Sequence, residues 1–195
     1  MQELNPVKFI LASSSPRRRE LLKQVGVEPL IVVPEVDESR KQDEPVDVFI
    51  RRVTLAKGSA VYREEYFFIP IISADTIVLC AGQLIGKPAN RDEAYRFLTL
   101  LSGNEHEVWT GVAILYRGES YYNLARTRVV FSEISQIELE HYLEHEHYMD
   151  KAGAYAIQGL ASLFVERIEG CYFNVMGFPL NLFYAMLKKI GLSLM

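Results

Sequence analysis

Residues 67–80 read FFIPIISADTIVLC, and this stretch decides the fold. Its isoleucines and valines favour a buried strand at the centre of a sheet. Asp75 and Thr76 nevertheless lie inside it. A carboxylate among apolar side chains costs free energy unless it is paired or bound to a metal ion. The stretch therefore predicts both a central strand and a candidate functional site.

Outward from this strand, strand-like and helix-like segments alternate along the chain. Residues 7–13 and 29–36 predict strands, and between them lies a helix that Ser15 caps, Pro16 opens and Gly26 ends. Alternation of this kind favours a mixed α/β fold, since a predicted hairpin prevents a wholly parallel sheet. The further predicted elements are an amphipathic helix at 45–62, a helix at 90–103, the hairpin of 107–116 with 120–134, a helix at 135–148, an ordered loop at 151–159, a strand at 162–170 and a final helix from about 174 or 179 to 189.

The composition argues against several classes of protein. The 195 residues carry a formal net charge of −4, so an anionic ligand has to be met by a local cluster of cations rather than by overall basicity. Cys80 and Cys171 lie far apart, which predicts reduced thiols in a cytoplasmic protein. The N-terminal residues lack the pattern of a signal peptide, and no apolar run is long enough to span a membrane.

The segment SSSPRRREL, residues 13–21, places three arginines in the first turn of its predicted helix. Each cation there loses about 0.3–1 kcal/mol, because the helix N-terminus is already electropositive. A bound anion reverses this penalty, since free N–H groups, serine hydroxyls and guanidinium groups then converge on it. We interpret the segment as a phosphate site; the alternative is a surface helix whose arginines cover apolar neighbours. The sequence contains neither the P-loop pattern nor GxGxxG.

Further charged side chains accompany Asp75. Glu38 follows the second predicted strand, and with Asp75 it offers the oxygen ligands that a hard divalent cation prefers. Lys57 lies in the amphipathic helix and Lys87 in a Gly-Lys-Pro turn, and both can supply positive charge. Asp75 itself is a candidate general base or metal ligand. The alternatives are a strand-end carboxylate that caps a helix and ordinary solvated surface charges.

Seven motifs, taken in order, resemble the Maf family of nucleoside triphosphate pyrophosphatases: ASSSPRRREL, VDES, LAKG, SADT, GKP, DKAGAYAIQG and YFNVMGFPL. They extend from about Phe9 to Leu187, so the resemblance covers essentially the whole chain. It implies the fold of the inosine triphosphate pyrophosphatases, an elongated mixed sheet flanked by helices with a cleft between two lobes. We therefore expect a single Maf-like domain over residues 1–195.

The resemblance also implies an activity. Members of the family hydrolyse a nucleoside triphosphate to the monophosphate and pyrophosphate with a divalent metal cation, Mg²⁺ or Mn²⁺. The pairing of ADT with IQG is similar to the branch that acts on dTTP and UTP. Because the family is also associated with arrest of septum formation, a nucleotide-binding regulator without turnover is the alternative. A cytoplasmic homodimer that binds neither nucleic acid nor membrane is a further expectation.

The family motifs assign roles to individual residues. Asp75 takes the proton-acceptor position, and Arg17, Thr76 and Gln158 match the positions linked to substrate choice. The Gln158 amide presents one donor and one acceptor, which suits the O4 and N3–H of thymine or uracil; the alternative is a glutamine that caps its own loop. We expect catalysis by Asp75, Glu38, Lys57 and Lys87, substrate binding by Ser13, Ser15, Arg17, Arg18, Thr76 and Gln158, and metal binding by Glu38 and Asp75.

Two residues depart from the family pattern. Phe178 stands where leucine is more usual, and Gly58 stands where alanine usually follows the motif lysine, Lys57. Neither residue touches the expected chemistry. Gly58 is expected to loosen its helix by up to ~1 kcal/mol relative to alanine, because glycine loses more backbone entropy when a helix forms.

Overall fold

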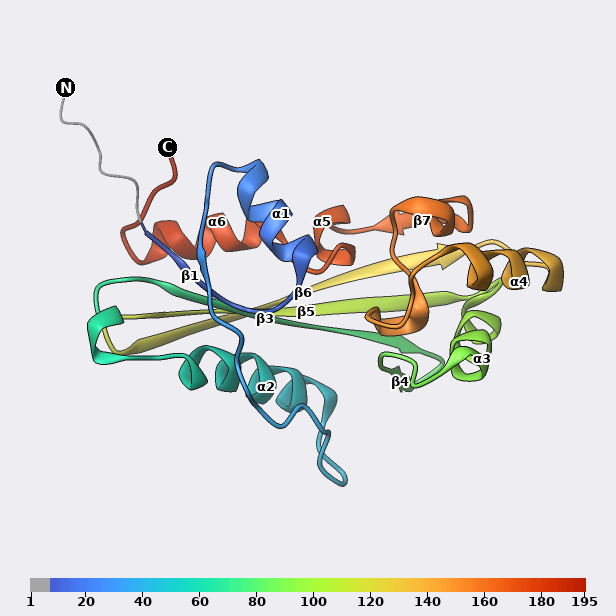
Figure 1. The fold of residues 1–195 in the computed structure, drawn as a ribbon, viewed down its shortest axis with the longest axis horizontal. Coiled ribbons are helices and arrows are strands. Elements are labelled where there is room, and N and C mark those ends of the chain that lie inside the picture. Colours follow the sequence, from blue (N-terminus) through green and yellow to red (C-terminus); the bar gives the residue numbers. More distant parts are fainter. Residues whose placement is uncertain (1–7) are drawn as a thin grey trace. The chain divides into compact units, whose positions relative to one another are not determined.

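The computed structural model describes residues 8–195, which form seven strands, six α-helices and three short 3₁₀ helices (Figure 1). The predicted mixed α/β class is confirmed. In chain order the elements are β1 (Ile10–Ala12), α1 (Pro16–Gln24), β2 (Leu30–Ile31), α2 (Val46–Ala60), η1 (Glu64–Tyr66), β3 (Ile71–Cys80), β4 (Gln83–Ile85), α3 (Arg91–Leu101), β5 (Glu105–Tyr116), β6 (Glu119–Phe131), α4 (Gln136–His145), η2 (Ala152–Ala154), η3 (Gly159–Leu163), β7 (Val165–Glu169), α5 (Tyr172–Val175) and α6 (Leu180–Lys189).

All seven strands belong to one mixed sheet in the order β2-β1-β3-β5-β6-β7, with β4 paired to β3 off this path. β1 runs parallel to β2 and β3, whereas β4 is antiparallel to β3 and β7 is antiparallel to β6. Ala12 of β1 is in register with Ser73 of β3. Asp75 lies two residues beyond Ser73 on β3. The turn from β1 into α1 therefore begins close to the level of Asp75 in the sheet.

The chain divides into two compact units. The first unit comprises Gly111–Leu124, Gly177–Met195 and the described part of Met1–Asp75; the second comprises Thr76–Thr110 and Ala125–Met176. Strands β3, β5 and β6 each contribute residues to both units, and in β3 the division falls between Asp75 and Thr76. The single domain over residues 1–195 remains a prediction.

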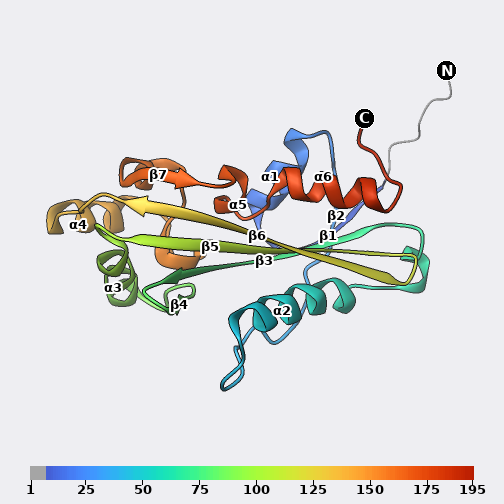
Figure 2. The ribbon, with the colours of Figure 1, turned by 180° about the vertical axis from the view of Figure 1, so that it is seen from behind.

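In the first unit, helices cover both faces of the sheet. α2 lies on one face and α1 with α6 on the other, as the front and rear views show (Figures 1 and 2). Ile50 and Val53 of α2 are fully buried, and on the other face the ring of Phe183 in α6 packs edge-on against Phe9 with centroids 6.2 Å apart. This packing buries the strands that carry the polar residues of the candidate site.

The second unit has its own apolar core. α3 and α4 contribute Leu98 and Leu143, while β5 and β6 contribute Val108 and Phe131 to one buried cluster. Both cysteines are free thiols, as predicted, and burial raises the pKa of Cys80. Within residues 8–195, no helix combines the length and the apolar character that crossing a bilayer requires.

Several element boundaries differ from the sequence prediction. β3 begins at Ile71 rather than at residue 67, because the chain before it turns: Phe67 N donates to Glu64 O at 3.1 Å and Ile69 N donates to Tyr66 O at 2.8 Å. The second strand shortens to Leu30–Ile31, and β4 is a strand that the sequence pattern did not predict. The final helix is α6 from Leu180 to Lys189, which agrees with the later of the two predicted starts. The short helix α5 before it was not predicted, and it ends ahead of Gly177, where φ is 102°. Val7 of the predicted first strand lies outside the described residues.

The close packing of α2 on β3 gives a testable stability prediction at Gly58. A Cβ atom there would lie 3.1 Å from the Ser73 hydroxyl oxygen, which donates to the carbonyl of Thr54 at 2.8 Å. We expect Gly58→Ala to stabilise the protein by close to ~1 kcal/mol in a Ser73→Ala background, as helix propensity requires. In the wild-type background the crowded serine should cancel most of that gain. Urea denaturation of the four proteins measures both effects, and equal gains in the two backgrounds would contradict the packing argument.

Candidate active site

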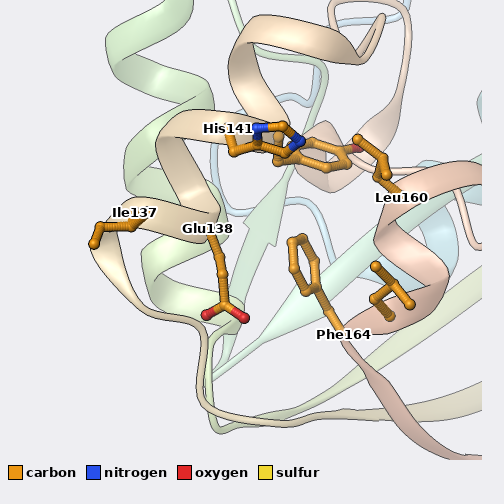
Figure 3. A pocket seen from close by; sticks show the side chains of 7 residues that line it. Ile137, Glu138, His141, Leu160 and Phe164 are labelled. Carbon is orange, nitrogen blue, oxygen red and sulfur yellow. The ribbon is translucent and has the colours of Figure 1, made fainter.

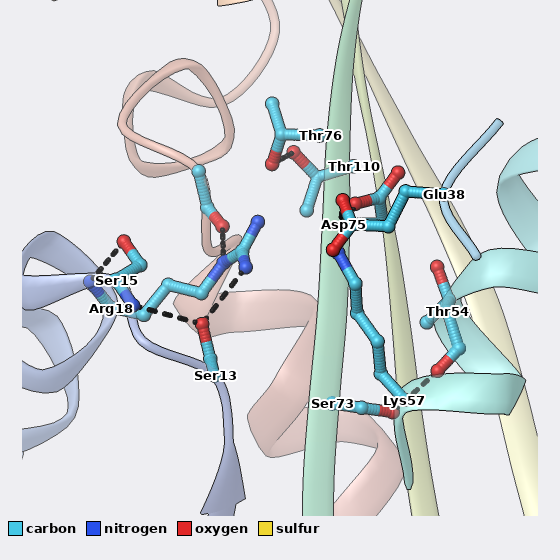
Figure 4. Close-up of polar contacts among 11 residues, drawn as sticks. Ser13, Ser15, Arg18, Glu38, Thr54, Lys57, Ser73, Asp75, Thr76 and Thr110 are labelled. Atoms are coloured by element: carbon cyan, nitrogen blue, oxygen red, sulfur yellow. Dashed lines mark hydrogen bonds and ion pairs between the residues drawn. The ribbon is translucent and has the colours of Figure 1, made fainter. Parts of the chain in front are cut away.

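One ammonium group joins two carboxylates at the candidate site in the first unit. Lys57 Nζ lies 2.6 Å from Asp75 Oδ1 and 3.0 Å from Glu38 Oε2 (Figure 4). Lys57 and Asp75 are buried, whereas the Glu38 side chain is 51% exposed. Both carboxylates therefore lie within ion-pair distance of the lysine, and the shared role of the three residues in a site remains a prediction.

Local structure explains how Lys57 and Asp75 meet. Alternation along β3 points Ser73 and Asp75 to the same face, toward α2. Ser73 donates to the Thr54 carbonyl, and Thr54 and Lys57 are three residues apart and therefore neighbours on the helix surface. The Ser73–Thr54 hydrogen bond and the Lys57–Asp75 ion pair thus both join β3 to α2. The buried aspartate is paired, as the cost of an isolated buried charge requires.

The start of α1 forms a second polar group in the same unit. Ser15 is the N-cap, as predicted, and its hydroxyl accepts from Arg18 N at 3.5 Å. The Arg18 side chain turns inward: Nη1 donates to Ser13 Oγ at 3.1 Å and Nε donates to the Gly177 carbonyl at 2.9 Å. Ser13 Oγ also accepts from Ser15 N at 3.1 Å.

The inward arginine lies in the electric field of the two carboxylates. Burial lowers the pKa of Arg18, and the negative charge of Asp75 and, to a smaller extent, of Glu38 opposes that decrease. Arg17 is half-buried and Arg19 is exposed. The first turn of α1 therefore turns the Arg18 guanidinium group inward, whereas the exposed Arg19 fits the surface-helix alternative.

Thr76, the first residue of the second unit, belongs to a buried hydroxyl network. Its Oγ1 lies 3.0 Å from Thr110 Oγ1, and Thr110 donates to the carbonyl of Asn174 at 3.2 Å. Because Thr110 has a single hydroxyl proton, Thr76 is the donor in the threonine pair. The fully buried Asn174 amide donates to the Val108 carbonyl and to Thr127 Oγ1, both at 2.9 Å. These hydrogen bonds connect Thr76 of β3, through Thr110 of β5, to Asn174 of α5.

The other two predicted site residues of the second unit are exposed. Lys87 follows β4, and Gln158 is the N-cap of η3, where its side chain makes no capping hydrogen bond. The turn beside Gln158 is held from α4, because Glu146 Oε1 accepts from Leu160 N at 2.7 Å. Gly159 has φ of 73°, and a Cβ atom there would collide with the Glu146 carboxylate. The positive φ favours glycine at this position, and a side chain there would also force the Glu146 carboxylate to move.

The loop at 151–159 is also anchored in the core of its unit. The Tyr155 hydroxyl lies 2.7 Å from His106 Nε2, and both rings pack against Phe131. Burial lowers the pKa of His106 to about 4, so the imidazole is neutral at pH 7, and burial also raises the pKa of Tyr155. The predicted loop at 151–159 thus contains the 3₁₀ helix η2 and is tied to the core through Tyr155.

The structure thus groups the predicted site residues by unit. Sequence reasoning missed several polar residues that support them: Glu44, Arg52, Thr110, Glu146 and Asn174. Thr110 could have been found from the sequence, because it is a polar residue inside an apolar strand, as Asp75 is. The first unit holds Ser13, Ser15, Arg17, Arg18, Glu38, Lys57 and Asp75, and the second holds Thr76, Lys87 and Gln158.

A pocket elsewhere in the second unit does not involve any predicted site residue (Figure 3). Its volume is about 270 Å³. Within residues 8–195, no cluster of three or more histidine, cysteine, aspartate or glutamate side chains is arranged to hold a metal ion. The pocket is lined by Ile137, Glu138, His141, Tyr142, Leu160, Leu163 and Phe164.

Comparison with known families places this arrangement in context. The family model described as Maf-like protein matches residues 8–190. The chain belongs to the Maf-like protein family. It is 43% identical over 193 residues to a dTTP/UTP pyrophosphatase of Caldicellulosiruptor bescii, covering 96% of this chain and 97% of that one. A dTTP/UTP pyrophosphatase of Syntrophomonas wolfei is 43% identical over 187 residues, covering 95% of this chain and 98% of that one.

The fold of this Maf-like protein also matches a solved structure. The Ham1 protein of Staphylococcus aureus superposes with a TM-score of 0.50 at 10% sequence identity, covering 94% of this chain and 99% of that chain. At such low identity the likeness concerns the fold alone. It confirms the expected similarity to the inosine triphosphate pyrophosphatase fold.

Proposed function

We propose that this Maf-like protein is a nucleoside triphosphate pyrophosphatase that hydrolyses dTTP and UTP, and modified pyrimidine nucleotides of the same type, to the monophosphate and pyrophosphate. The names of its relatives support the substrate class. The observation that carries the chemistry is the buried Lys57, held between Asp75 and Glu38 in the unit that also contains the inward Arg18. Two carboxylates beside several cations suit a metal-assisted attack on a polyanion.

Phosphate binding falls to the start of α1 and to the lysines. A triphosphate carries about four negative charges, which cations and helix N–H groups must balance. The hydroxyls of Ser13 and Ser15 accept hydrogen bonds from N–H groups, so each can still donate its own proton to a phosphate oxygen. Arg17, Arg18, Lys57 and Lys87 supply the positive charge in this proposal.

The carboxylates fit a divalent cation that arrives with the substrate. Mg²⁺ is commonly bound by one or two carboxylates together with substrate phosphates and water. Glu38 and Asp75 meet that requirement, because their oxygens share one ammonium group and Glu38 is open to solvent. When bound, Mg²⁺ or Mn²⁺ would stabilise the negative charge of the pyrophosphate leaving group. Chelation by EDTA is expected to abolish turnover, and excess Mg²⁺ should restore it.

Asp75 is the residue that receives the proton of the attacking water in this proposal. The water oxygen forms a bond to the α-phosphorus, and the bond from the α-phosphorus to the bridging oxygen breaks. That oxygen leaves with pyrophosphate, and the nucleoside monophosphate remains. Lys57 holds the Asp75 carboxylate in place, and Arg18 offsets its negative charge.

A pyrophosphate-release assay tests the proposed function. With Mg²⁺ present we expect release from dTTP and UTP, and much less from CTP, GTP and 7-methyl-GTP. The alternative is a nucleotide-binding regulator of septum formation. Binding of dTTP without release from any nucleotide would favour the regulator and would contradict the enzyme. We further propose that the protein acts as a cytoplasmic homodimer with one domain per chain.

Base selection is the expected role of Gln158. Its amide matches the O4 acceptor and the N3–H donor of uracil and thymine, and a mismatched base would leave polar groups unpaired. We expect Gln158→Ala to reduce the preference for UTP over CTP by at least ~10-fold in kcat/KM, with a smaller change in kcat for UTP. Gln136→Ala, an exposed glutamine on α4, is the matched control. An unchanged substrate profile would remove Gln158 from base recognition.

A further inference from the structure

Glu38 reaches Lys57 from a segment without regular secondary structure. It lies in the stretch between β2 and α2, and its own side chain is half-exposed. Ordering each residue of such a stretch costs about 1–2 kcal/mol in backbone entropy. The pair of Glu38 with the buried Lys57 is open to solvent on the glutamate side, where screening limits an ion pair to about 0–1 kcal/mol. The contact of Glu38 with Lys57 is therefore too weak to order the loop by itself.

A second, better buried ion pair lies at the far end of the same loop. Arg52 of α2 donates from Nε to Glu44 Oε1 at 2.7 Å and from Nη2 to Glu44 Oε2 at 2.8 Å. The same Nη2 also donates to the carbonyl of Ser39 at 2.9 Å. We call these three contacts the loop clamp. Paired guanidinium–carboxylate bonds of this kind are strong and geometrically specific.

Glu44 is held firmly enough to serve as an anchor. Its side chain is buried, and it also accepts from Lys41 N at 3.1 Å, while its carbonyl accepts from Arg40 Nε at 2.7 Å. The hydrogen bonds from Arg52 lower the pKa of Glu44 to about 2. The carboxylate is therefore ionised throughout the neutral range, as its paired bonds to Arg52 require.

The backbone on either side of Glu38 is tied to this anchor. The carbonyl of Ser39, the next residue, accepts a hydrogen bond from Arg52. The Ser39 N–H donates to Asp37 Oδ1 at 2.8 Å. Arg52 and Lys57 lie on the same helix, so the clamp and the Glu38 contact share one rigid support. Arg52 thus binds the loop at Ser39 and at Glu44. These contacts hold the backbone of Glu38 where its carboxylate reaches Lys57.

We propose that Arg52 and Glu44 are positioning residues that hold Glu38 in the catalytic site. This inference rests on the proposed pyrophosphatase function, in which Glu38 binds the substrate's metal ion. Loss of the clamp releases the loop, displaces Glu38 from Lys57 and lowers turnover through that displacement alone. A displacement of about 1 Å at a reacting centre can cost about 100-fold in rate.

The first test measures the loop directly. Arg40 and Lys41 are exposed trypsin sites within the clamped loop. We expect Arg52→Gln to accelerate cleavage at these two sites in the folded protein by at least ~10-fold, because the opened loop is more accessible. Arg51→Gln removes the same charge from the neighbouring exposed position, which contacts the Tyr122 ring, and should leave the cleavage rate unchanged.

The second test separates positioning from general destabilisation. We expect Arg52→Gln to lower kcat/KM for dTTP by about 10- to 100-fold in the wild-type background. In a Glu38→Gln background the same change should have little further effect, since residues that act through one another are non-additive. Arg52→Lys keeps the charge but loses the paired bonds, and it should give an intermediate loss. Urea denaturation shows whether Arg52→Gln folds properly. If it does not, Arg52→Lys replaces it in this test.

Each outcome has a distinct meaning. Faster cleavage together with an activity loss that vanishes in the Glu38→Gln background supports the proposal. An unchanged cleavage rate overturns the clamp, and equal activity losses in both backgrounds overturn its action through Glu38. If the wild-type protein released no pyrophosphate from any nucleotide, the proposed function would fail, and the cleavage test alone would then decide whether the clamp holds the loop.

Discussion

Asp75→Asn is expected to lower kcat for dTTP by about 10²- to 10⁴-fold, the range usual for the loss of a positioned general base. The amide oxygen can still accept a hydrogen bond from Lys57 Nζ, which lies 2.6 Å from the carboxylate in the wild-type protein. The substitution preserves shape and removes only the charge and the proton-accepting ability. The folded structure should therefore persist while the chemistry stops.

Steady-state pyrophosphate release measures this effect, and circular dichroism with urea denaturation verifies the fold. Asp47→Asn, an exposed carboxylate in the first turn of α2, is the matched control and should keep the wild-type rate. Near-native turnover by Asp75→Asn would remove this aspartate from the mechanism. A loss of cooperative unfolding would instead show that the aspartate is needed for folding.

Lys57→Met is expected to destabilise the protein more than Asp75→Asn, Arg52→Gln or Gln158→Ala. It strips the counter-ion from Asp75, which is only 8% exposed, and leaves Glu38 facing a second carboxylate. Removing one partner of a buried ion pair typically costs about 3–5 kcal/mol. Turnover should fall as well, because the ammonium group both orients Asp75 and balances phosphate charge in the proposed mechanism.

The double variant Lys57→Met/Asp75→Asn distinguishes an unpaired charge from a packing defect. It carries no buried charge at this position, so it should be more stable than Lys57→Met alone even though it contains one more substitution. Lys23→Met, an exposed lysine at the end of α1, controls for the removal of a surface charge. Equal stabilities of Lys57→Met and the double variant, measured by urea denaturation, would show that charge burial is not the cause.

The features that could be predicted from sequence are those that local forces decide. The Ser15 cap, the strand around Asp75 and the long helix that carries Lys57 all follow from side-chain periodicity and capping within a few residues. The family motifs added the expected site residues. The short strand β4 and the short helix α5 were not predicted, because each depends on contacts with distant parts of the chain that the local pattern does not encode.

The sequence alone therefore determined the mixed α/β class, the family and the kinds of side chain available for chemistry. Only the tertiary structure decided which charges meet. Arg18 bonds to a carbonyl 159 residues further along the chain, and Arg52 rather than its neighbour Arg51 is the partner of Glu44. The physical reason is that burial, hydrogen bonds and ion pairs act through space. Neighbouring arginines that look equivalent in the sequence acquire different roles only when the folded chain surrounds one of them with acceptors.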